Sequence, residues 1–192
     1  MPDIAFRTEA READVEAVRS LTAGTGFFTP EEVAIAAELV EERVAKGDRS
    51  DYHFVFADGP ALEGPSGAAG AETTGQLRGY ACFGPIPGTD RRFDLYWIAV
   101  EPGLQRRGLG RRILVEAERR AAALGAVRLY VDTSTSEKYA PTRAFYRRNG
   151  YAVAAEMPDF FREGDGKTIF VKRLPPLPAL LPSGPAAAAA PG

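Results

Sequence analysis

The chain is poor in the residues that build disulfides and metal sites. Its 192 residues include one cysteine, Cys82, and one histidine, His53. A single cysteine excludes an internal disulfide and cysteine-based zinc sites, and a single histidine excludes metal sites built from several imidazoles. No apolar run approaches the ~20 residues that a membrane-spanning helix needs, and the first residues have no apolar signal region. We therefore expect no metal and no membrane partner, and we expect the cytoplasm as the location.

An excess of charge of either sign is missing as well. The formal net charge is −2 and the isoelectric point is near 5.6. These values leave no electrostatic footprint for nucleic acid or a membrane surface, so neither is expected as a partner. The length fits one domain with a sizeable core, which we place at residues 1–174. Residues 175–192 are rich in Pro and Ala, cannot bury a core and are expected to be disordered.

Strand and helix patterns alternate along this domain. Asp14 is expected to cap a helix that ends near residue 21, while Thr29 and Pro30 start a helix that Gly47 ends. Residues 58–75, rich in Gly, Ala and Pro, are expected to form an expanded hairpin loop. Strands are expected at residues 4–7, 52–56, 77–83, 93–100, 127–131, 151–155 and 168–173, and further helices at residues 109–124 and 141–149.

The most informative segment joins the apolar run at residues 94–100 to the helical pattern after residue 109. A helix N-terminus leaves backbone N–H groups unpaired and carries partial positive charge, so it binds anions. Gly108 and Gly110 let the backbone approach a phosphate closely. Positive side chains are added by Arg106, Arg107 and Arg111. The segment therefore predicts a pyrophosphate site between a strand and a helix.

Two other readings of the glycines fail. A dinucleotide-binding fingerprint would need a third glycine where the chain has Ile113. The run from Gly166 to Thr168 resembles the end of a phosphate-binding P-loop, but the first glycine of that motif would fall at Phe161. Thr168 also leads into a strand-like run instead of a helix. Neither motif is therefore present.

Two sequence elements resemble the GNAT superfamily of acetyl-CoA-dependent N-acetyltransferases. The segment from Gln105 to Gly110 matches the family signature Gln/Arg-x-x-Gly-x-Gly/Ala at every fixed position. Some forty residues later, Tyr146, Gly150 and Tyr151 match a second element, in which a helical Tyr precedes Gly and an aromatic residue. The resemblance covers roughly residues 4–174. It implies an α/β fold with a mostly antiparallel sheet of six to seven strands, splayed between its central parallel strands and flanked by about four helices.

The resemblance also implies catalytic roles for two side chains. Asp94 stands eleven positions before Gln105, where one branch of the family has a general-base Glu, and its shorter side chain favours a bridging water. The alternative is a solvent-facing polar residue at a strand end. Tyr146 stands where the family has its general acid, and a phenol can protonate a departing thiolate. The alternative is a packing aromatic.

Acetyl-CoA is the co-substrate that the resemblance implies. The backbone N–H of Ile98 would polarise the thioester carbonyl, and Val100 would hold the pantetheine arm. Many members have Asn where this chain has Tyr139, so either the Tyr139 hydroxyl supplies an alternative contact to the cofactor or that contact is absent. Tyr139, Arg143 and Tyr146 share one helix face. Trp97, on the opposite strand face from Ile98, is expected in the core. The residues expected to bind the cofactor are Ile98, Val100, Gln105, Arg106, Arg107, Gly108, Gly110, Arg111, Tyr139 and Arg143.

The acceptor is the least defined part of the prediction. In the family the acceptor cleft is walled by the segments that correspond here to residues 22–29 and 157–166, and both contain a Phe-Phe pair. The second is also acidic, which favours a cationic amine near an apolar group, although a solvated turn explains it equally well. The residues expected to bind the acceptor are Phe27, Phe28, Asp159 and Phe160.

We expect transfer of an acetyl group to the primary amine of a small molecule, such as an amino acid, by direct attack in a ternary complex. Acetylation of a protein or peptide, or transfer of a larger acyl group, remains as an alternative, and the weak net charge argues against tRNA. A non-enzymatic acyl-CoA sensor is a third reading, against which the intact loop motif and Tyr146 argue. A homodimer is compatible with all three.

Overall fold

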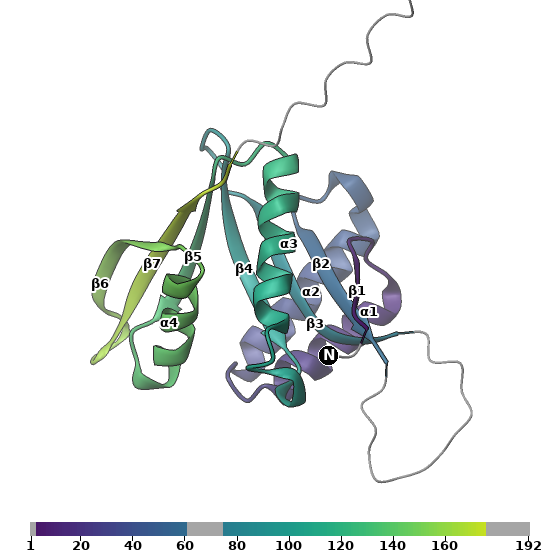
Figure 1. Ribbon diagram of the computed structural model, residues 1–192, viewed down its shortest axis with the longest axis horizontal. Helices are drawn as coiled ribbons and strands as arrows, with labels where there is room; N and C mark the ends of the chain where they lie inside the picture. Colours follow the sequence, from purple (N-terminus) through teal and green to yellow (C-terminus); the bar gives the residue numbers. More distant parts are fainter. Residues whose placement is uncertain (1–2, 61–74, 176–192) are drawn as a thin grey trace, which may run out of the picture.

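A computed structural model of the chain describes residues 3–60 and 75–175, and it contains one seven-stranded sheet (Figure 1). The strands are β1 (Ala5–Arg7), β2 (His53–Gly59), β3 (Gln76–Pro85), β4 (Arg92–Val100), β5 (Arg128–Ser134), β6 (Ala152–Arg162) and β7 (Asp165–Arg173). The helices are α1 (Glu12–Gly24), α2 (Pro30–Lys46), α3 (Leu109–Ala123) and α4 (Ala140–Arg148), with short 3-10 turns η1 (Gly47–Arg49), η2 (Pro102–Leu104) and η3 (Glu137–Tyr139). The sheet order is β1-β2-β3-β4-β5-β7-β6.

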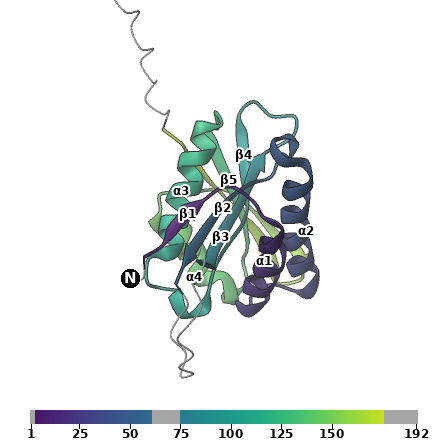
Figure 2. The ribbon, with the colours of Figure 1, turned by 90° about the vertical axis from the view of Figure 1, so that its right-hand side faces the viewer.

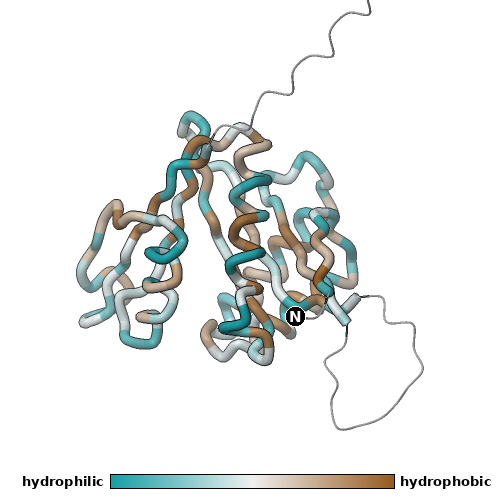
Figure 3. The backbone as a smooth tube through the Cα atoms, viewed as in Figure 1, coloured by the Kyte–Doolittle hydropathy of each residue, from teal (hydrophilic) through white to brown (hydrophobic). Residues whose placement is uncertain are grey.

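The four helices cover the sheet from both faces (Figure 2). On one face, the apolar stripe of α3 packs with Tyr146 of α4 against sheet residues such as Leu129 and Phe170. On the other face, α1 and α2 pack against a second set that includes Phe54 and Tyr80. Figure 3 shows apolar residues recurring along α3 between hydrophilic ones, as expected for a helix with one buried face. The sheet is thus buried on both sides through its centre.

The centre of the sheet contains its single parallel contact among the described residues. All neighbouring strands pair antiparallel except β4 and β5. Their parallel pairing covers three positions and ends where Asp94 meets Tyr130. A β-bulge in β4 follows at once, because Trp97 pairs with Cys82 while Leu95 pairs with Phe83, which leaves Tyr96 extra. Bulges bend a strand and interrupt its ladder, so β4 and β5 diverge beyond this point.

The element order predicted from sequence is confirmed, and the predicted start of α2 is correct. Thr29 Oγ1 accepts a hydrogen bond from the Glu32 N–H at 3.2 Å, and Pro30 is the first helical residue. The prediction for α1 was wrong by one turn. Arg11 occupies the N-cap position, and Asp14, three residues later, accepts a hydrogen bond from the Arg11 N–H at 2.8 Å. Asp14 therefore stabilises the start of α1 from the third helical position (N3) and not from the N-cap position.

The last two strands are longer than predicted, so residues 157–166 are not the loop that the sequence suggested. β6 continues to Arg162, and its pairing with β7 is irregular at two places, between Val153 and Ala155 and between Met157 and Arg162. Pro158 fits into β6 because this strand lies at the sheet edge, where one side needs no N–H donor. Most of the predicted loop at residues 58–75 and nearly all of the predicted tail lie outside the described residues. Within the described ranges, no helix is long and apolar enough to cross a membrane.

Candidate active site

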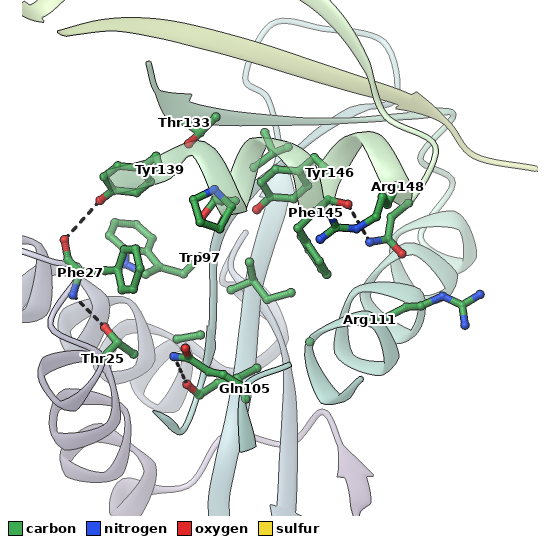
Figure 4. A pocket seen from close by; sticks show the side chains of 18 of the residues that line it. Thr25, Phe27, Trp97, Gln105, Arg111, Thr133, Tyr139, Phe145, Tyr146 and Arg148 are labelled. Atoms are coloured by element: carbon green, nitrogen blue, oxygen red, sulfur yellow. Dashed lines mark hydrogen bonds between the residues drawn. The ribbon is translucent and has the colours of Figure 1, made fainter. Parts of the chain in front are cut away.

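A cavity of about 640 Å³ opens where β4 and β5 diverge. Its size falls in the range of small-molecule sites, which is roughly 300–1,000 Å³. Its walls come from β4, the α1–α2 connection, the start of α3, the end of β5 and α4. Figure 4 shows Phe27, Trp97 and Tyr139 at one end, Arg111 and Arg148 at the other, and Tyr146 between them. The cavity therefore has two chemically different ends.

The N-terminus of α3 forms one end. Gly108 is the N-cap residue with φ of 87°, and Arg106 in the preceding loop also has a positive φ of 60°. No side chain caps this helix, and no acidic residue lies in its first turn. The first-turn N–H groups are thus left for a ligand, and the helix dipole makes this end attractive to anions.

Three guanidinium groups strengthen this positive end. Arg106, Arg111 and Arg148 all line the cavity, and none of them makes a salt bridge to the residues that the structure describes. Arginines without acidic partners around a helix N-terminus favour phosphate groups. The sequence predicted Arg106 and Arg111 here, and Arg148 is an addition from the end of α4.

Gly110 leaves space between α3 and α4 within the same cavity. A Cβ atom added there would lie 3.6 Å from Val100 Cγ2 and 3.8 Å from Phe145 Cε2, and both of those residues line the cavity. These are ordinary contact distances, so a methyl group would occupy cavity space without a steric clash. Gln105 adjoins this space, and its Nε2 donates to the Val100 carbonyl at 3.2 Å.

Tyr146 lies between the two ends. It is 3% exposed, and its ring packs against Phe145, Tyr151 and Phe170 with centroid distances of 5.3, 5.5 and 5.7 Å. It nevertheless lines the cavity, and its hydroxyl makes no hydrogen bond to the described residues. Burial raises the pKa of the Tyr146 phenol above its usual range, so the hydroxyl stays protonated at neutral pH.

Aromatic side chains dominate the opposite end of the cavity. They come from three separate segments: the α1–α2 connection, the bulge in β4, and η3. Trp97, which the sequence placed in the core, packs against the core on the α1–α2 face and also lines the cavity. The aromatic lining residues at this end are Phe27, Phe28, Tyr96, Trp97 and Tyr139.

Two carboxylates lie on the strands that flank the divergence. Asp132 on β5 lines the cavity and forms a salt bridge with Lys167 on β7. Asp94 on β4 occupies the last paired position before the strands separate. Burial, with a smaller contribution from Asp132, raises the pKa of Asp94 to about 6, while Lys167 opposes this shift. Asp94 can therefore exchange a proton near neutral pH.

Two buried polar atoms in the cavity wall make no hydrogen bond within the part of the chain that the structure describes. Thr133 is 6% exposed, and its Oγ1 makes no hydrogen bond. The indole Nε1 of Trp97 is buried and unpaired as well. Both residues line the cavity. Buried polar groups in native proteins are usually satisfied, so these two atoms fit a site that takes a ligand.

The structure brings most of the predicted site residues together. The ones that line the cavity are Phe27, Phe28, Ile98, Val100, Gln105, Arg106, Gly108, Gly110, Arg111, Tyr139 and Tyr146. Arg107 does not line the cavity although both of its chain neighbours do, and Asp94 does not line it either, two residues before the lining Tyr96. Arg143 points elsewhere, because its Nη1 donates to the carbonyls of Ser134 and Ser136, both at 2.8 Å.

The two predicted acceptor residues in β6 do not reach the cavity. Asp159 Oδ1 accepts a hydrogen bond from the Gly164 N–H at 2.7 Å, so Asp159 stabilises the β6–β7 turn. The Phe160 side chain is 49% exposed, and the Lys167 ammonium lies 4.8 Å from the centre of its ring. The acidic turn is thus a solvated hairpin end, which is the alternative that the sequence left open.

Sequence reasoning missed Asp132, Thr133 and Arg148. A usable signal existed for the first two, because an apolar strand that changes abruptly to Asp-Thr-Ser is typical of a strand ending at a site. Arg148 is one of several arginines in α4, and nothing in their spacing distinguishes it. No group of three potential metal ligands occurs in the parts of the chain that the structure describes.

The comparisons with known proteins agree with this architecture. A family model described as the acetyltransferase (GNAT) family matches residues 33–151. Among solved structures, a protein assigned to the GNAT family from Desulfovibrio desulfuricans shares 41% sequence identity with a TM-score of 0.79, over 90% of this chain and 100% of that chain. A search of curated proteins finds no match.

More distant structures share the fold. The ribosomal-protein-S18-alanine N-acetyltransferase from Escherichia coli is 16% identical with a TM-score of 0.63, over 93% of this chain and 99% of that chain. The yncA protein from Salmonella typhimurium, solved with its cofactor acetyl-CoA, is 19% identical with a TM-score of 0.65, over 99% of this chain and 98% of that chain.

Proposed function

Because the chain belongs to the acetyltransferase (GNAT) family, we propose that it transfers an acetyl group from acetyl-CoA to the primary amine of a small molecule, by direct attack in a ternary complex. One observation carries the proposal. A single cavity connects an uncapped helix N-terminus, beside arginines that form no salt bridge with the described residues, to an aromatic and acidic end, and Tyr146 lies between the two ends. Such a cavity can hold an anionic donor and a cationic acceptor side by side.

The positive end is assigned to the donor. The N–H groups at the start of α3, together with Arg106, Arg111 and Arg148, would hold the pyrophosphate and other phosphate oxygens. The space beside Gly110 and along Val100 would take the pantetheine arm. When bound, acetyl-CoA supplies a thioester as the activated acyl group.

The divergence of β4 from β5 is assigned to carbonyl polarisation. Beyond Asp94 no pairing joins β4 to β5 within the described residues, so backbone groups on that side of β4 are free to meet a ligand. The Ile98 N–H would donate to the carbonyl oxygen that gains negative charge as the amine attacks. Preorganised donors of this kind are often the largest contribution to rate.

Asp94 is assigned the role of general base. An amine must lose a proton to attack, and a carboxylate with a pKa of about 6 accepts that proton more readily than one near 4. Because Asp94 does not line the cavity, it would act through a water molecule. Asp132 lines the cavity and would hold the incoming ammonium before the proton is removed.

Tyr146 is assigned to the leaving sulfur. Its hydroxyl makes no hydrogen bond to the described residues, and burial raises the pKa of the phenol, which ordinarily already exceeds the value of about 8.5 for a thiol. Complete proton transfer to the thiolate is therefore uphill. We infer that Tyr146 acts mainly by donating a hydrogen bond to the sulfur as negative charge develops on it.

Calorimetric titration of the purified protein with acetyl-CoA, succinyl-CoA and free CoA tests the donor. We expect micromolar binding with a preference for acetyl-CoA, and acetyl-CoA-dependent thiol release when amines are added. A preference for succinyl-CoA would indicate transfer of a larger acyl group. Binding without thiol release for any amine, peptides included, would indicate an acyl-CoA sensor, and absence of binding to all three would overturn the proposal.

A further inference from the structure

We propose that the aromatic end of the cavity selects a primary amine carried as a single cation on an apolar, ring-sized group, and discriminates against amines that also carry a carboxylate. The inference rests on the proposed acetyl transfer and narrows its acceptor class. It differs from the expectation drawn from sequence, which included amino acids and relied on the acidic β6–β7 turn.

The wall at this end offers aromatic surface to a ligand. Phe27, Phe28, Tyr96, Trp97 and Tyr139 are all partly buried and all line the cavity. The bulge in β4 makes Tyr96 and Trp97 pack on the same side of the sheet, against the α1–α2 core. Aromatic faces attract organic cations and also bury apolar groups. Five such rings around one space favour a ligand that has both features.

The wall is held in place across the gap between the two halves of the sheet. Tyr139 Oη donates to the Phe27 carbonyl at 3.3 Å, and the two rings contact edge to face with centroids 5.8 Å apart. Lys138 Nζ donates to the same carbonyl at 2.9 Å and lies 5.3 Å from the centre of the Phe27 ring. The Phe27 ring thus already attracts one cation of this chain, and Lys138 itself does not line the cavity.

The charges at this end favour a cation over an anion. Asp132 is the one acidic side chain among the described residues that line the cavity, and the lining arginines Arg111 and Arg148 lie at the end opposite Phe27, Trp97 and Tyr139 (Figure 4). Lys167, the nearest opposite charge, is held in its salt bridge to Asp132, and Asp94 adds a second carboxyl behind it. An ammonium group therefore meets a carboxylate in the cavity wall, whereas an acceptor carboxylate would meet Asp132, and the cation nearest to Asp132 is already paired with it; Lys138, the other cation near this end, does not line the cavity.

Trp97 allows binding to be measured without turnover, because it is the single tryptophan of the chain and lies in this wall. The protein, saturated with free CoA, is titrated while Trp97 fluorescence is recorded. The probes are phenethylamine, phenethyltrimethylammonium, phenylalanine and spermidine. The trimethylammonium probe keeps the ring and the charge but cannot be acetylated, so it reports recognition alone.

We expect phenethylamine and phenethyltrimethylammonium to bind at least tenfold more tightly than phenylalanine and spermidine. Phe27→Leu should weaken both favoured probes several-fold, whereas Phe27→Tyr, which keeps the ring, should leave them within about twofold. Asp132→Asn should weaken them too, whereas Glu137→Gln, an exposed carboxylate of η3 outside the cavity, should not.

The outcomes separate this inference from the proposed function. Equal or tighter binding of phenylalanine or spermidine, in a protein that still binds acetyl-CoA and releases thiol, would overturn the acceptor class and leave acetyl transfer intact. Loss of acetyl-CoA binding would overturn the function instead. If a wall variant fails to fold by circular dichroism, the ranking of the four probes on the unaltered protein still decides the question.

Discussion

The two ends of the cavity are built in opposite ways. The positive end comes largely from one continuous segment, the loop before α3 and its first turn, and uses backbone N–H groups with unpaired arginines. The aromatic end is assembled from the α1–α2 connection, the β4 bulge, β5 and η3. Backbone recognition of phosphate depends on local conformation, whereas recognition of an organic cation depends on side chains from distant segments. The first end therefore suits a common donor, and the second can differ from one acceptor to another.

A side chain that fills the positive end of the cavity should cause the largest loss of function among these variants, through loss of acetyl-CoA affinity. Gly110→Val would place methyl groups in the space between Val100 and Phe145. We expect acetyl-CoA affinity to fall about 100-fold, equivalent to about 3 kcal/mol, with little change in melting temperature. Calorimetry with acetyl-CoA measures the first quantity and thermal unfolding the second.

Gly24→Ala is the matched control, because a Cβ there meets no atom within 4 Å. It should leave acetyl-CoA affinity unchanged. Full affinity in Gly110→Val would show that the donor does not use this space, and the assignment of the two ends would have to be exchanged or abandoned.

Replacing Tyr146, which lies between the two ends, should lower turnover without weakening acetyl-CoA binding. Tyr146→Phe removes a hydroxyl that makes no hydrogen bond to the residues that the structure describes, so this part of the fold loses no hydrogen bond. We expect turnover to fall about 100-fold, the usual scale for a lost acid–base group, while acetyl-CoA affinity changes less than about twofold. Steady-state kinetics and calorimetry separate these two quantities.

Tyr151→Phe provides the comparison for this variant. The Tyr151 hydroxyl is buried and makes no hydrogen bond to the described residues, and Tyr151 does not line the cavity. It should leave turnover unchanged. Equal turnover in Tyr146→Phe and the unaltered protein would reduce Tyr146 to a packing residue, which the sequence had left as an alternative.

The contrast between the ends explains what sequence reasoning could find. Gly108, Gly110 and the adjacent arginines are contiguous, and their function follows from helix-terminus physics, so a motif is enough to predict them. The order of strands and helices was predictable for the same reason, since hydrophobic periodicity is local.

The aromatic end has no comparable signal in the sequence. A single extra residue in β4, Tyr96, shifts the register of the β3–β4 pairing, so that Trp97 packs against the core and also lines the cavity. No local sequence pattern marks Tyr96 as the bulged residue. Asp132 is recognised as a site residue only from the structure, because the divergence of β4 from β5 places it beside the cavity. Asp159 and Phe160 looked suitable by composition, but the longer β6 carries them away from the cavity.

The roles of Asp94 and Asp132 can be tested through the pH dependence of turnover. With a pKa of about 6, Asp94 is increasingly ionised as pH rises through that value, so turnover should rise over the same interval. Asp94→Asn should remove this limb of the profile and lower turnover at neutral pH by roughly tenfold or more. Because Asp132 raises the pKa of Asp94, Asp132→Asn should move the limb to lower pH.

The stability of Asp94→Asn should change with pH in a defined direction. The folded pKa of Asp94 lies above the usual 3.8, so the ionised form is disfavoured in the fold. Well below the unfolded pKa of 3.8, at about pH 2.5, the carboxyl is neutral in both states and costs nothing, whereas well above about pH 6 the full cost is present. The Asn variant should therefore gain melting temperature at about pH 8 and not at about pH 2.5. The same gain at both values would mean that Asp94 is not destabilised by its charge.

The smallest expected effect concerns the contact that closes the aromatic end. Tyr139→Phe keeps the ring against Phe27 but removes the 3.3 Å hydrogen bond to its carbonyl, which Lys138 still contacts at 2.9 Å. One long hydrogen bond with a remaining partner is worth at most about 1 kcal/mol, so the KM for the acceptor amine should rise about two- to fivefold. Acetyl-CoA affinity should stay constant, because Arg106, Arg111 and Arg148 are untouched. A variant that weakens acetyl-CoA binding as strongly as acceptor binding would show that Tyr139 belongs to the donor side, and the two ends would then share a wall.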